Sequence, residues 1–490
     1  MPRVKQPHSL EDISLHGFGR CIQTLAYEGR DYQQAGWNSL YEFLYASLPW
    51  CFRDKVACQI LRSVSRACGE ANLKECSTAM VKLIEVACRL NLRVVDFSAW
   101  PIFVQNVLLE NVHRLDQMEI LNTGREYSIF YIGNKVEQLL KVVGDNCPKL
   151  EHLEVHYCVS EKSVRPLLQC RHLRVLVLRS INIDVAACHQ LLTGLQHLET
   201  VEIVTPKYES NVVKALKAIH RSNGQLPSLR SLTIHIAKQK HLKVVHAACP
   251  RLEKLGLILS SSYKTDSVPF KPVAITDLSL QFSCKVYNSS KKFRKLLGAI
   301  GLNLSSLNLD CVTHCSVNLL ELSHLCPNLR RMTLVCYRCM DVPRTATLFR
   351  HLEHLDIDQK DYNTLFLEPI LRSCPNITSL AVRFGQFTHC FYNVERIVIS
   401  DTIISNILRV NSLACLEEFV VRGESRLTVE TVRMLMESCP NLRKLIINDV
   451  WHMSQEELTS FKQQLQENNL DLGVYYFKYI GSDRTYNSEP

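Results

Sequence analysis

The sequence predicts an α/β solenoid of strand–helix repeats that is preceded by a small all-α module. A segment in which Cys-Pro is followed by alternating apolar positions recurs, beginning at Cys147, Cys249, Cys326 and Cys439. A unit repeated at such intervals is typical of stacked, solenoid-like folds. The chain has 490 residues, of which 46% are hydrophobic and 21% charged. This is the composition of an ordinary globular protein, in a chain too long for one compact core.

Residues 1–89 precede the first repeat and show a different pattern. Apolar residues at helical spacing predict a helix over Leu10–Leu25 and a second over Trp37–Leu48. A third helix is predicted to begin at Pro49, since proline suits the first turn of a helix, and a fourth to cover Ala79–Ala87. We assign this segment to a helical docking module or N-terminal cap.

Residues 90–470 carry the pattern L-x-x-L-x-L, most copies of which lie about 23 to 26 residues apart, within the range of leucine-rich repeats. The last two apolar positions alternate, as a strand with one buried face requires. Segments such as Val429–Ser438 predict the helix of each unit, which Cys-Pro then ends. We therefore expect a leucine-rich-repeat horseshoe, with parallel strands inside the curve and helices outside.

A long interval follows the copy at Leu198, Val201 and Ile203, and two further copies also depart from regular spacing. One is read as Leu115, Met118 and Ile120, followed by a long interval. The other is read as Val394, Ile397 and Ile399, and it follows its predecessor so closely that no helix is expected between them.

Residues 471–490 are predicted to form a cap strand and a disordered tail. The run Val474–Phe477 is rich in aromatic residues, and such a strand would cover the open edge of the last repeat. The disordered tail is expected from Gly481 onwards.

The cysteines favour a reducing compartment. Their number, 21, is odd, and several precede proline at one fixed place in the repeat, which suits a small buried apolar side chain. We see no apolar signal region and no apolar stretch of the ~20 residues that span a bilayer. We expect a protein of the cytoplasm, or else of the nucleus, without a membrane partner.

Composition and motifs argue against catalysis and against nucleic-acid binding. The net charge of +9 is spread along the chain and indicates a solvated surface. The common motifs of hydrolases, nucleotide-binding proteins and metalloproteases are absent. Cys336 and Cys339 form a lone C-x-x-C pair, which is weak evidence for zinc. We expect no enzyme, no cofactor and no metal site.

The repeats resemble the cysteine-containing leucine-rich repeats of ubiquitin-ligase receptors, because Leu153–Cys158 reads L-x-L-x-x-C. The segment from Ser9 to Phe18 resembles the BC box, the helix by which such receptors dock onto Elongin C. Ser9, Leu10 and Phe18 match that motif, and Ser14 stands where the family prefers cysteine.

The segment Leu48–Val56 resembles a cullin box of the cullin-2 kind. Leu48, Pro49, Phe52 and Val56 match that motif, whereas Cys51 stands where a cullin-5 box would have a second proline. The resemblance implies a non-catalytic substrate-recognition subunit of a cullin-RING E3 ubiquitin ligase. Its implied partners are Elongin C with Elongin B, cullin-2 and a protein substrate.

Two alternatives stay open. Leu48-Pro49 could instead open an F-box, which docks onto Skp1 and cullin-1. A scaffold outside any ligase is the other alternative. In it, Leu10, Phe18, Leu48 and Phe52 would be core residues of a cap that seals the first repeat.

The concave face of the predicted sheet is our candidate substrate site, with the loops and the ends of the solenoid as alternatives. Outward strand positions there carry mixed charge, which favours a protein partner over a polyanion. The candidate residues are His156, Arg331, Asp356, Arg383, Arg422 and Lys444. Further outward positions of the same predicted face are His152, Glu154, Lys254, His354, Arg396 and Glu418.

Overall fold

A computed structural model gives the arrangement of the chain, which divides into two compact units. The first unit comprises His8–Leu252 and the second includes Glu253–Pro490. The structure describes residues 9–28, 34–70, 77–124, 135–156, 161–179, 183–204, 211–238, 240–264, 275–282, 289–311, 316–340, 342–343, 346–359, 365–384, 399–422, 425–448, 451–468 and 472–477.

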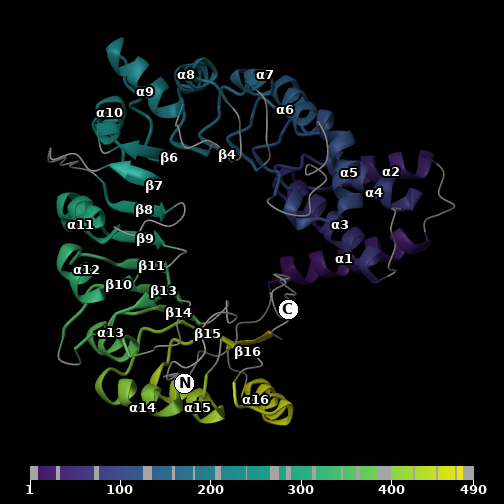
Figure 1. Ribbon diagram of the computed structural model, residues 1–490. Coiled ribbons are helices and arrows are strands. Elements are labelled where there is room, and N and C mark those ends of the chain that lie inside the picture. The colour runs from purple at the N-terminus through teal and green to yellow at the C-terminus, as the bar shows by residue number, and fades with distance from the viewer. Residues whose placement is uncertain are drawn as a thin grey trace. The chain divides into compact units, whose positions relative to one another are not determined.

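Four helices open the first unit, where the amphipathic patterns predict them (Figure 1). They are α1 (Leu10–Glu28), α2 (Gln34–Ser47), α3 (Trp50–Glu70) and α4 (Thr78–Arg89). Helix α3 packs against both α1 and α4, and α2 packs against α4. The sides that meet are apolar, and Ile22, Ile60 and Leu83 are almost completely buried there.

The rest of the first unit alternates strands and helices. Strands β1 (Val94–Asp96), β2 (Ile120–Asn122), β3 (His152–Val155), β4 (Val175–Arg179), β5 (Thr200–Val204) and β6 (Ser231–Lys238) pair in parallel in chain order. The connections hold α5 (Ile102–Asn111), α6 (Lys135–Asn146), α7 (Glu161–Val164), α8 (Val185–Gly194), α9 (Asn211–Arg221) and the 3-10 helices η2 (Phe97–Ala99), η3 (Val112–Arg114) and η5 (Arg165–Gln169). Helix α10 (Lys240–Ala248) follows β6.

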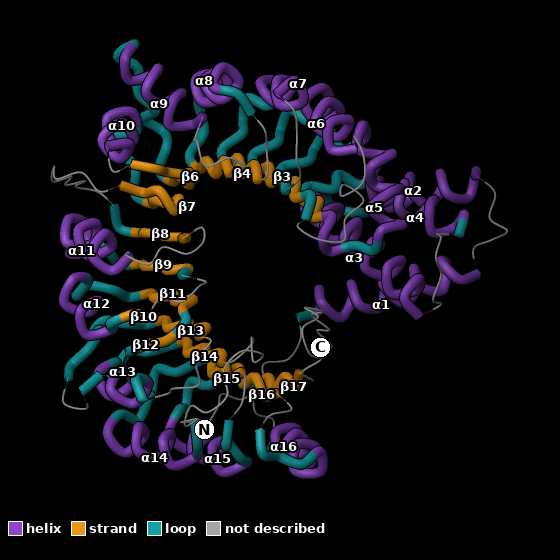
Figure 2. The backbone as a smooth tube through the Cα atoms, viewed as in Figure 1, coloured by secondary structure: helices purple, strands orange, loops and turns teal. Residues whose placement is uncertain are grey.

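The second unit continues the same alternation. Its parallel sheet has the order β7 (Lys254–Lys264), β8 (Asp277–Phe282), β9 (Ser306–Asp310), β11 (Arg331–Cys336), β13 (His354–Gln359), β14 (Ser379–Phe384), β15 (Glu418–Arg422), β16 (Lys444–Asn448) and β17 (Gly473–Phe477). One face of this sheet is covered by the helices of the connections (Figure 2). These are α11 (Ser289–Ile300), η6 (Gly301–Asn303), α12 (Leu319–Leu325), α13 (Leu367–Ser373), α14 (Asp401–Val410), α15 (Val429–Ser438) and α16 (Gln455–Glu467). Strands β10 (Ser316–Val317) and β12 (Arg338–Cys339) form a separate pair.

One face of the sheet builds the core, because alternate strand residues point between strands and helices. In the second unit Met332, Leu355, Leu380, Phe419 and Leu445 occupy the same register position on successive strands, and all are buried. The α/β repeat architecture predicted from the sequence is therefore confirmed. The predicted cap strand is present as β17, which pairs in parallel with β16, whereas the tail from Gly481 lies outside the described residues.

The cysteines that precede proline are core residues, as predicted. Cys147, Cys249, Cys326, Cys374 and Cys439 have no exposed surface. Burial raises the pKa of each of these thiols to about 12. The last of them also ends a helix, since its backbone N–H donates to the carbonyl of Leu435 at 2.8 Å, just beyond α15.

The register predicted for the second repeat was wrong by three residues. Leu121, and not Met118, pairs with Val95 on one side and Leu153 on the other. The third apolar position of this repeat is taken by Thr123, which is fully buried. A polar residue there hid the pattern, and Leu115, at the end of η3, offered a false one with the same spacing.

Ile399, the described member of the triplet read at Val394, Ile397 and Ile399, belongs to no strand of the sheet. Strand β14 pairs directly with β15, with Leu380 opposite Phe419. The long connection between these strands contains α14 and the buried Ile399. Val394 and Ile397 lie outside the described residues.

Candidate functional site

Helix α1 begins with a reciprocal cap built from the first residue of the BC-box-like segment. The hydroxyl oxygen of Ser9 accepts a hydrogen bond from the backbone N–H of Asp12 at 3.1 Å. The Asp12 carboxylate accepts in return from the hydroxyl of Ser9 at 2.7 Å and from its N–H at 3.3 Å. Such caps satisfy N–H groups that a helix start leaves without partners. Ser9 therefore fixes where α1 starts.

The two faces of α1 differ in burial. Gly19, Ile22 and Ala26 are buried, and a Cβ atom added at Gly19 would contact the side chains of Gln59 and Ser63 on α3. This is the face that packs on the rest of the module.

The BC-box-like positions lie on the adjacent face, one helical turn apart. Ser14, Gly17 and Cys21 are exposed, and Phe18 is half-buried. Apart from its chain neighbours and the backbone of its own helix, no described atom lies within 4 Å of a Cβ added at Gly17. The side chain of Leu10 lies outside the described part of the structure.

The cullin-box-like segment forms the junction of α2 and α3. Pro49 is exposed, and Leu48 and Phe52 are half-buried, whereas Val56 is only 5% exposed and contributes to the core. Beside Pro49, the ring of Trp50 is 73% exposed. The first three motif positions are therefore accessible at one end of α3, and Val56 is not.

Arg53 holds this junction together. Its guanidinium donates to the backbone carbonyls of Tyr45, at 2.8 Å, and Leu48, at 3.3 Å, and it stacks 3.7 Å from the centre of the Tyr45 ring. The end of α2 and the start of α3 are thus fixed relative to each other.

The two motif-like segments lie on neighbouring helices. Lys55 on α3 forms an ion pair with Glu11 on α1. The hydrogen bond to Glu11 raises the pKa of Lys55, and the ammonium group also lies 5.3 Å from the centre of the Phe52 ring. The first turn of α1 is thereby connected to the accessible end of α3.

A groove of about 350 Å³ runs over the outward face of β11, β13, β14, β15 and β16 in the second unit. Its floor is apolar, because Ala381, Val420 and Ile446 stand at one register position on three adjacent strands. Charged side chains border this floor. Those that line the groove are Arg331, Asp356, Arg383, Glu418, Arg422 and Lys444.

Two ion pairs cross the groove. Arg383 and Asp356 are 2.6 Å apart between Nη1 and Oδ1, and Lys444 and Glu418 are 2.6 Å apart between Nζ and Oε1. Burial acts to raise the pKa of Glu418, but hydrogen bonds from Lys444 and Ser379 outweigh it, so the pKa lies below its usual value. Glu418 is therefore ionised at neutral pH and holds Lys444 at the edge of the floor.

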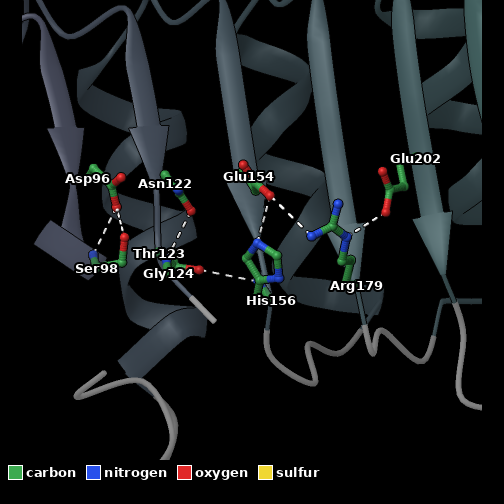
Figure 3. Close-up of polar contacts among 9 residues, drawn as sticks. All are labelled: Asp96, Ser98, Asn122, Thr123, Gly124, Glu154, His156, Arg179 and Glu202. Atoms are coloured by element: carbon green, nitrogen blue, oxygen red, sulfur yellow. Dashed lines mark hydrogen bonds and ion pairs between the residues drawn. The ribbon is translucent and has the colours of Figure 1, made fainter. Parts of the chain in front are cut away.

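Five of the six predicted substrate residues line this groove, and the sixth, His156, belongs to the first unit. His156 lies in a closed polar network (Figure 3). Its Nε2 is 2.7 Å from Oε1 of Glu154, and Arg179 pairs with both Glu154 and Glu202. Only 6% of the His156 side chain is exposed, so it is not available to a partner. Arg396 lies outside the described residues.

The apolar floor was missed in the sequence because its residues stand at outward positions, where polar residues are expected. The signal that could have revealed it is the recurrence of a small or branched apolar residue at that position in three successive repeats.

The described part of the chain contains no group of three or more His, Cys, Asp or Glu side chains that could hold a metal ion. The Sγ atoms of Cys336 and Cys339 are 3.7 Å apart and buried, and their hydrogen bond, together with burial, raises the pKa of Cys339. None of the described helices combines the length and apolarity required to cross a bilayer.

No family model matches the sequence, and no curated protein matches it. Solved structures show low similarity. A leucine-rich-repeat protein of Leptospira interrogans is 14% identical over 82% of this chain and 93% of its own, with a TM-score of 0.32. A chain of the Rad7 and Elc1 complex of yeast is 15% identical over 98% and 97%, with a TM-score of 0.37.

A leucine-rich-repeat protein of Bacteroides thetaiotaomicron is 10% identical over 75% of this chain and 45% of its own, with a TM-score of 0.29. Leucine-rich repeats are also the fold class of the present chain, in which parallel strands alternate with helices in most of the described connections.

Proposed function

We propose that the chain is a substrate-recognition subunit of a cullin-RING E3 ubiquitin ligase. In this proposal the face of α1 that carries Ser14 and Phe18 binds Elongin C, itself joined to Elongin B. The start of α3, with Leu48, Pro49 and Phe52, meets cullin-2. The leucine-rich repeats form a protein-binding scaffold that holds the substrate.

One observation carries the docking half of the proposal. The two motif-like segments lie on helices that contact each other through Glu11 and Lys55, and their motif positions are mostly left outside the core. A helix that exposes anchors at this spacing can lie in the groove of a partner. The alternative in which the module only seals the first repeat expects Phe18, Leu48 and Phe52 to be buried, and they are half-buried.

The proposed subunit performs no bond chemistry. Its contribution is to raise the local concentration of a substrate lysine near the ubiquitin-charged enzyme, which makes the encounter effectively intramolecular. We place this activity in the cytoplasm, or else in the nucleus.

Pull-down of purified Elongin B–Elongin C by the full-length chain tests the docking. Phe18→Asp should abolish capture, because it puts a charge at a half-buried anchor position. His16→Asp is the matched control, since His16 is exposed on another side of the same helix and should leave capture unchanged. Ser14→Cys should strengthen capture, because it restores the residue that the family prefers.

Thermal unfolding of each variant distinguishes docking from a purely structural cap. The proposal predicts lost capture by Phe18→Asp with a melting temperature close to that of the unaltered chain. Undiminished capture by Phe18→Asp would contradict the proposal, and lost capture with a large fall in melting temperature would favour the cap.

A further inference from the structure

We infer that the groove of the second unit binds an extended, acidic peptide segment in which one apolar side chain lies two residues from a carboxylate. This deepens the proposed function, because it names the class of substrate segment that the repeats would hold. The inference rests on the apolar floor, on the charges around it and on the size of the groove.

The apolar floor is complementary to one apolar side chain of a ligand. Ala381, Val420 and Ile446 are 8%, 3% and 5% exposed, although they stand on the outward face of the sheet. They adjoin one another across β14, β15 and β16. A groove of about 350 Å³ is at the lower end of the range of ligand pockets, so it accommodates one or two side chains and not a folded domain.

The charged side chains that border the floor are complementary to a carboxylate of a ligand. Four lining residues are cationic, Arg331, Arg383, Arg422 and Lys444, and two are acidic, Asp356 and Glu418, so cationic residues outnumber acidic ones in the lining. The acidic residues are already paired with Arg383 and Lys444.

Arg331 is the clearest site for an added anion. It is exposed at the start of β11, lines the groove and forms no ion pair among the described residues. A carboxylate that reached its guanidinium would form a charge-assisted hydrogen bond, which is stronger than one between neutral groups. Arg422 and Arg383 are neighbours at the ends of β15 and β14, whereas Arg331 stands at the start of β11.

The polar network of the first unit is an outward face on which the charged side chains are paired with one another. There Glu154 and Glu202 flank Arg179, and His156 closes the set (Figure 3). In that network carboxylates surround the cation, whereas in the groove the cations are in excess. The groove is therefore complementary to an acidic ligand, and complementary charge both speeds association and selects the partner.

An extended peptide meets both requirements at once. Alternate residues of an extended chain point to the same side, so an apolar residue and an acidic residue two positions away both face the sheet. The apolar side chain would lie at the Ala381 end of the floor, against Val420, which is the end nearer Arg331. The long Arg331 side chain would span the remaining distance to the carboxylate.

Fluorescence anisotropy with the full-length chain tests the inference. The probe is a labelled glycine-serine peptide that carries Asp-Ser-Leu-Ser-Asp at its centre. Two matched peptides replace both Asp by Lys or the Leu by Ser. We expect the acidic leucine peptide to bind, and we expect its affinity to fall as the salt concentration rises. Each matched peptide should bind at least about tenfold more weakly, a difference in binding free energy of roughly 1.4 kcal/mol.

Substitutions locate the binding. Arg331→Gln should weaken the acidic peptide by about tenfold. Arg330→Gln is the matched control, because Arg330 precedes it, pairs with Glu353 at 2.8 Å and does not line the groove. Val420→Gln should weaken binding without changing its salt dependence, because Val420 adjoins Ala381 in the floor.

The inference is overturned if the acidic leucine peptide does not bind, if the lysine peptide binds as well, or if Arg330→Gln has the same effect as Arg331→Gln. These readouts require no Elongin C. Capture of Elongin C by Arg331→Gln should stay unchanged, so failure of the peptide site and failure of the docking proposal are distinguishable.

Discussion

Lys55 donates a hydrogen bond from its ammonium group to the carboxylate of Glu11, and this contact joins the two segments that resemble docking motifs. The residues are far apart in sequence, on α3 and α1, and their side chains are 51% and 38% exposed. An ion pair with this exposure is screened by solvent and contributes little to stability. Its consequence is therefore local: it orients the first turn of α1 against the start of α3.

Charge reversal should loosen that turn without unfolding the protein. Lys55→Glu places two carboxylates together, so we expect faster hydrogen exchange at the start of α1, with little change in the melting temperature of the whole protein. Adding Glu11→Lys should restore slow exchange. Exchange that stays unchanged in Lys55→Glu would show that the pair does not hold α1.

Cysteine labelling should map the docking face. Cys21 and Cys51 are exposed on α1 and α3, so iodoacetamide at pH 8 should modify them in the native protein. Cys326 and Cys439 should react slowly, because they are buried and burial raises the pKa of each thiol to about 12. The thiolate is the reactive species.

Elongin C should protect Cys21, which follows the BC-box-like positions on the same face of α1. Cys415 is the control, because it is exposed in the second unit and should label at the same rate with and without Elongin C. Full labelling of Cys21 at saturating Elongin C would exclude this face of α1 as the contact.

The buried thiols should make the protein sensitive to alkaline pH. Their pKa is about 12 in the folded chain, against an ordinary value of 9.0, for Cys147, Cys188, Cys249, Cys326, Cys374 and Cys439. Unfolding lowers the pKa, so the stability that these groups contribute is fully present below pH 9.0 and declines as pH rises toward 12.

Thermal unfolding between pH 7 and pH 11 checks this expectation. The melting temperature should fall above pH 9, and the fall should be shallower in Cys326→Ala than in the unaltered chain, relative to each protein's own value at pH 7. Equal slopes would mean that ionisation of this thiol does not contribute.

The hydroxyl of Thr123 should contribute to the stability of the folded protein. Its Oγ1 accepts a hydrogen bond from the backbone N–H of His156 at 3.2 Å, between neighbouring repeats. Thr123→Val keeps the shape and removes the acceptor at a fully buried position, so we expect a loss of about 1–3 kcal/mol in denaturant unfolding. Thr123→Ser keeps the hydroxyl and should cost less. A valine variant at least as stable as the serine variant would contradict the assignment.

The sequence was sufficient to predict the repeat because each unit buries its own apolar residues at fixed spacing. Leu355 and Leu380, for example, fall on neighbouring strands at the positions that L-x-x-L-x-L assigns them. The pattern misled only where a polar residue replaced an apolar one, as at Thr123, or where apolar spacing arose in a connection, as at Ile399. Strand pairing decides such cases, and one sequence does not contain it.

The candidate sites were less predictable, since both depend on which residues become neighbours. Arg331, Asp356 and Arg383 could be assigned to an outward face from alternation alone. Their meeting around Ala381 and Val420 depends on the register between strands. Likewise the motif spacing predicted that Val56 and Phe52 both contact cullin-2. Helix packing buries Val56 and leaves Phe52 half-buried.

Affinity purification of the full-length chain from cells, followed by mass spectrometry, tests the central claim most directly. The account predicts recovery of Elongin C, Elongin B and cullin-2, and their loss in the Phe18→Asp variant with retention in His16→Asp. Recovery of Skp1 and cullin-1 instead, or of no cullin and no adaptor, would contradict it.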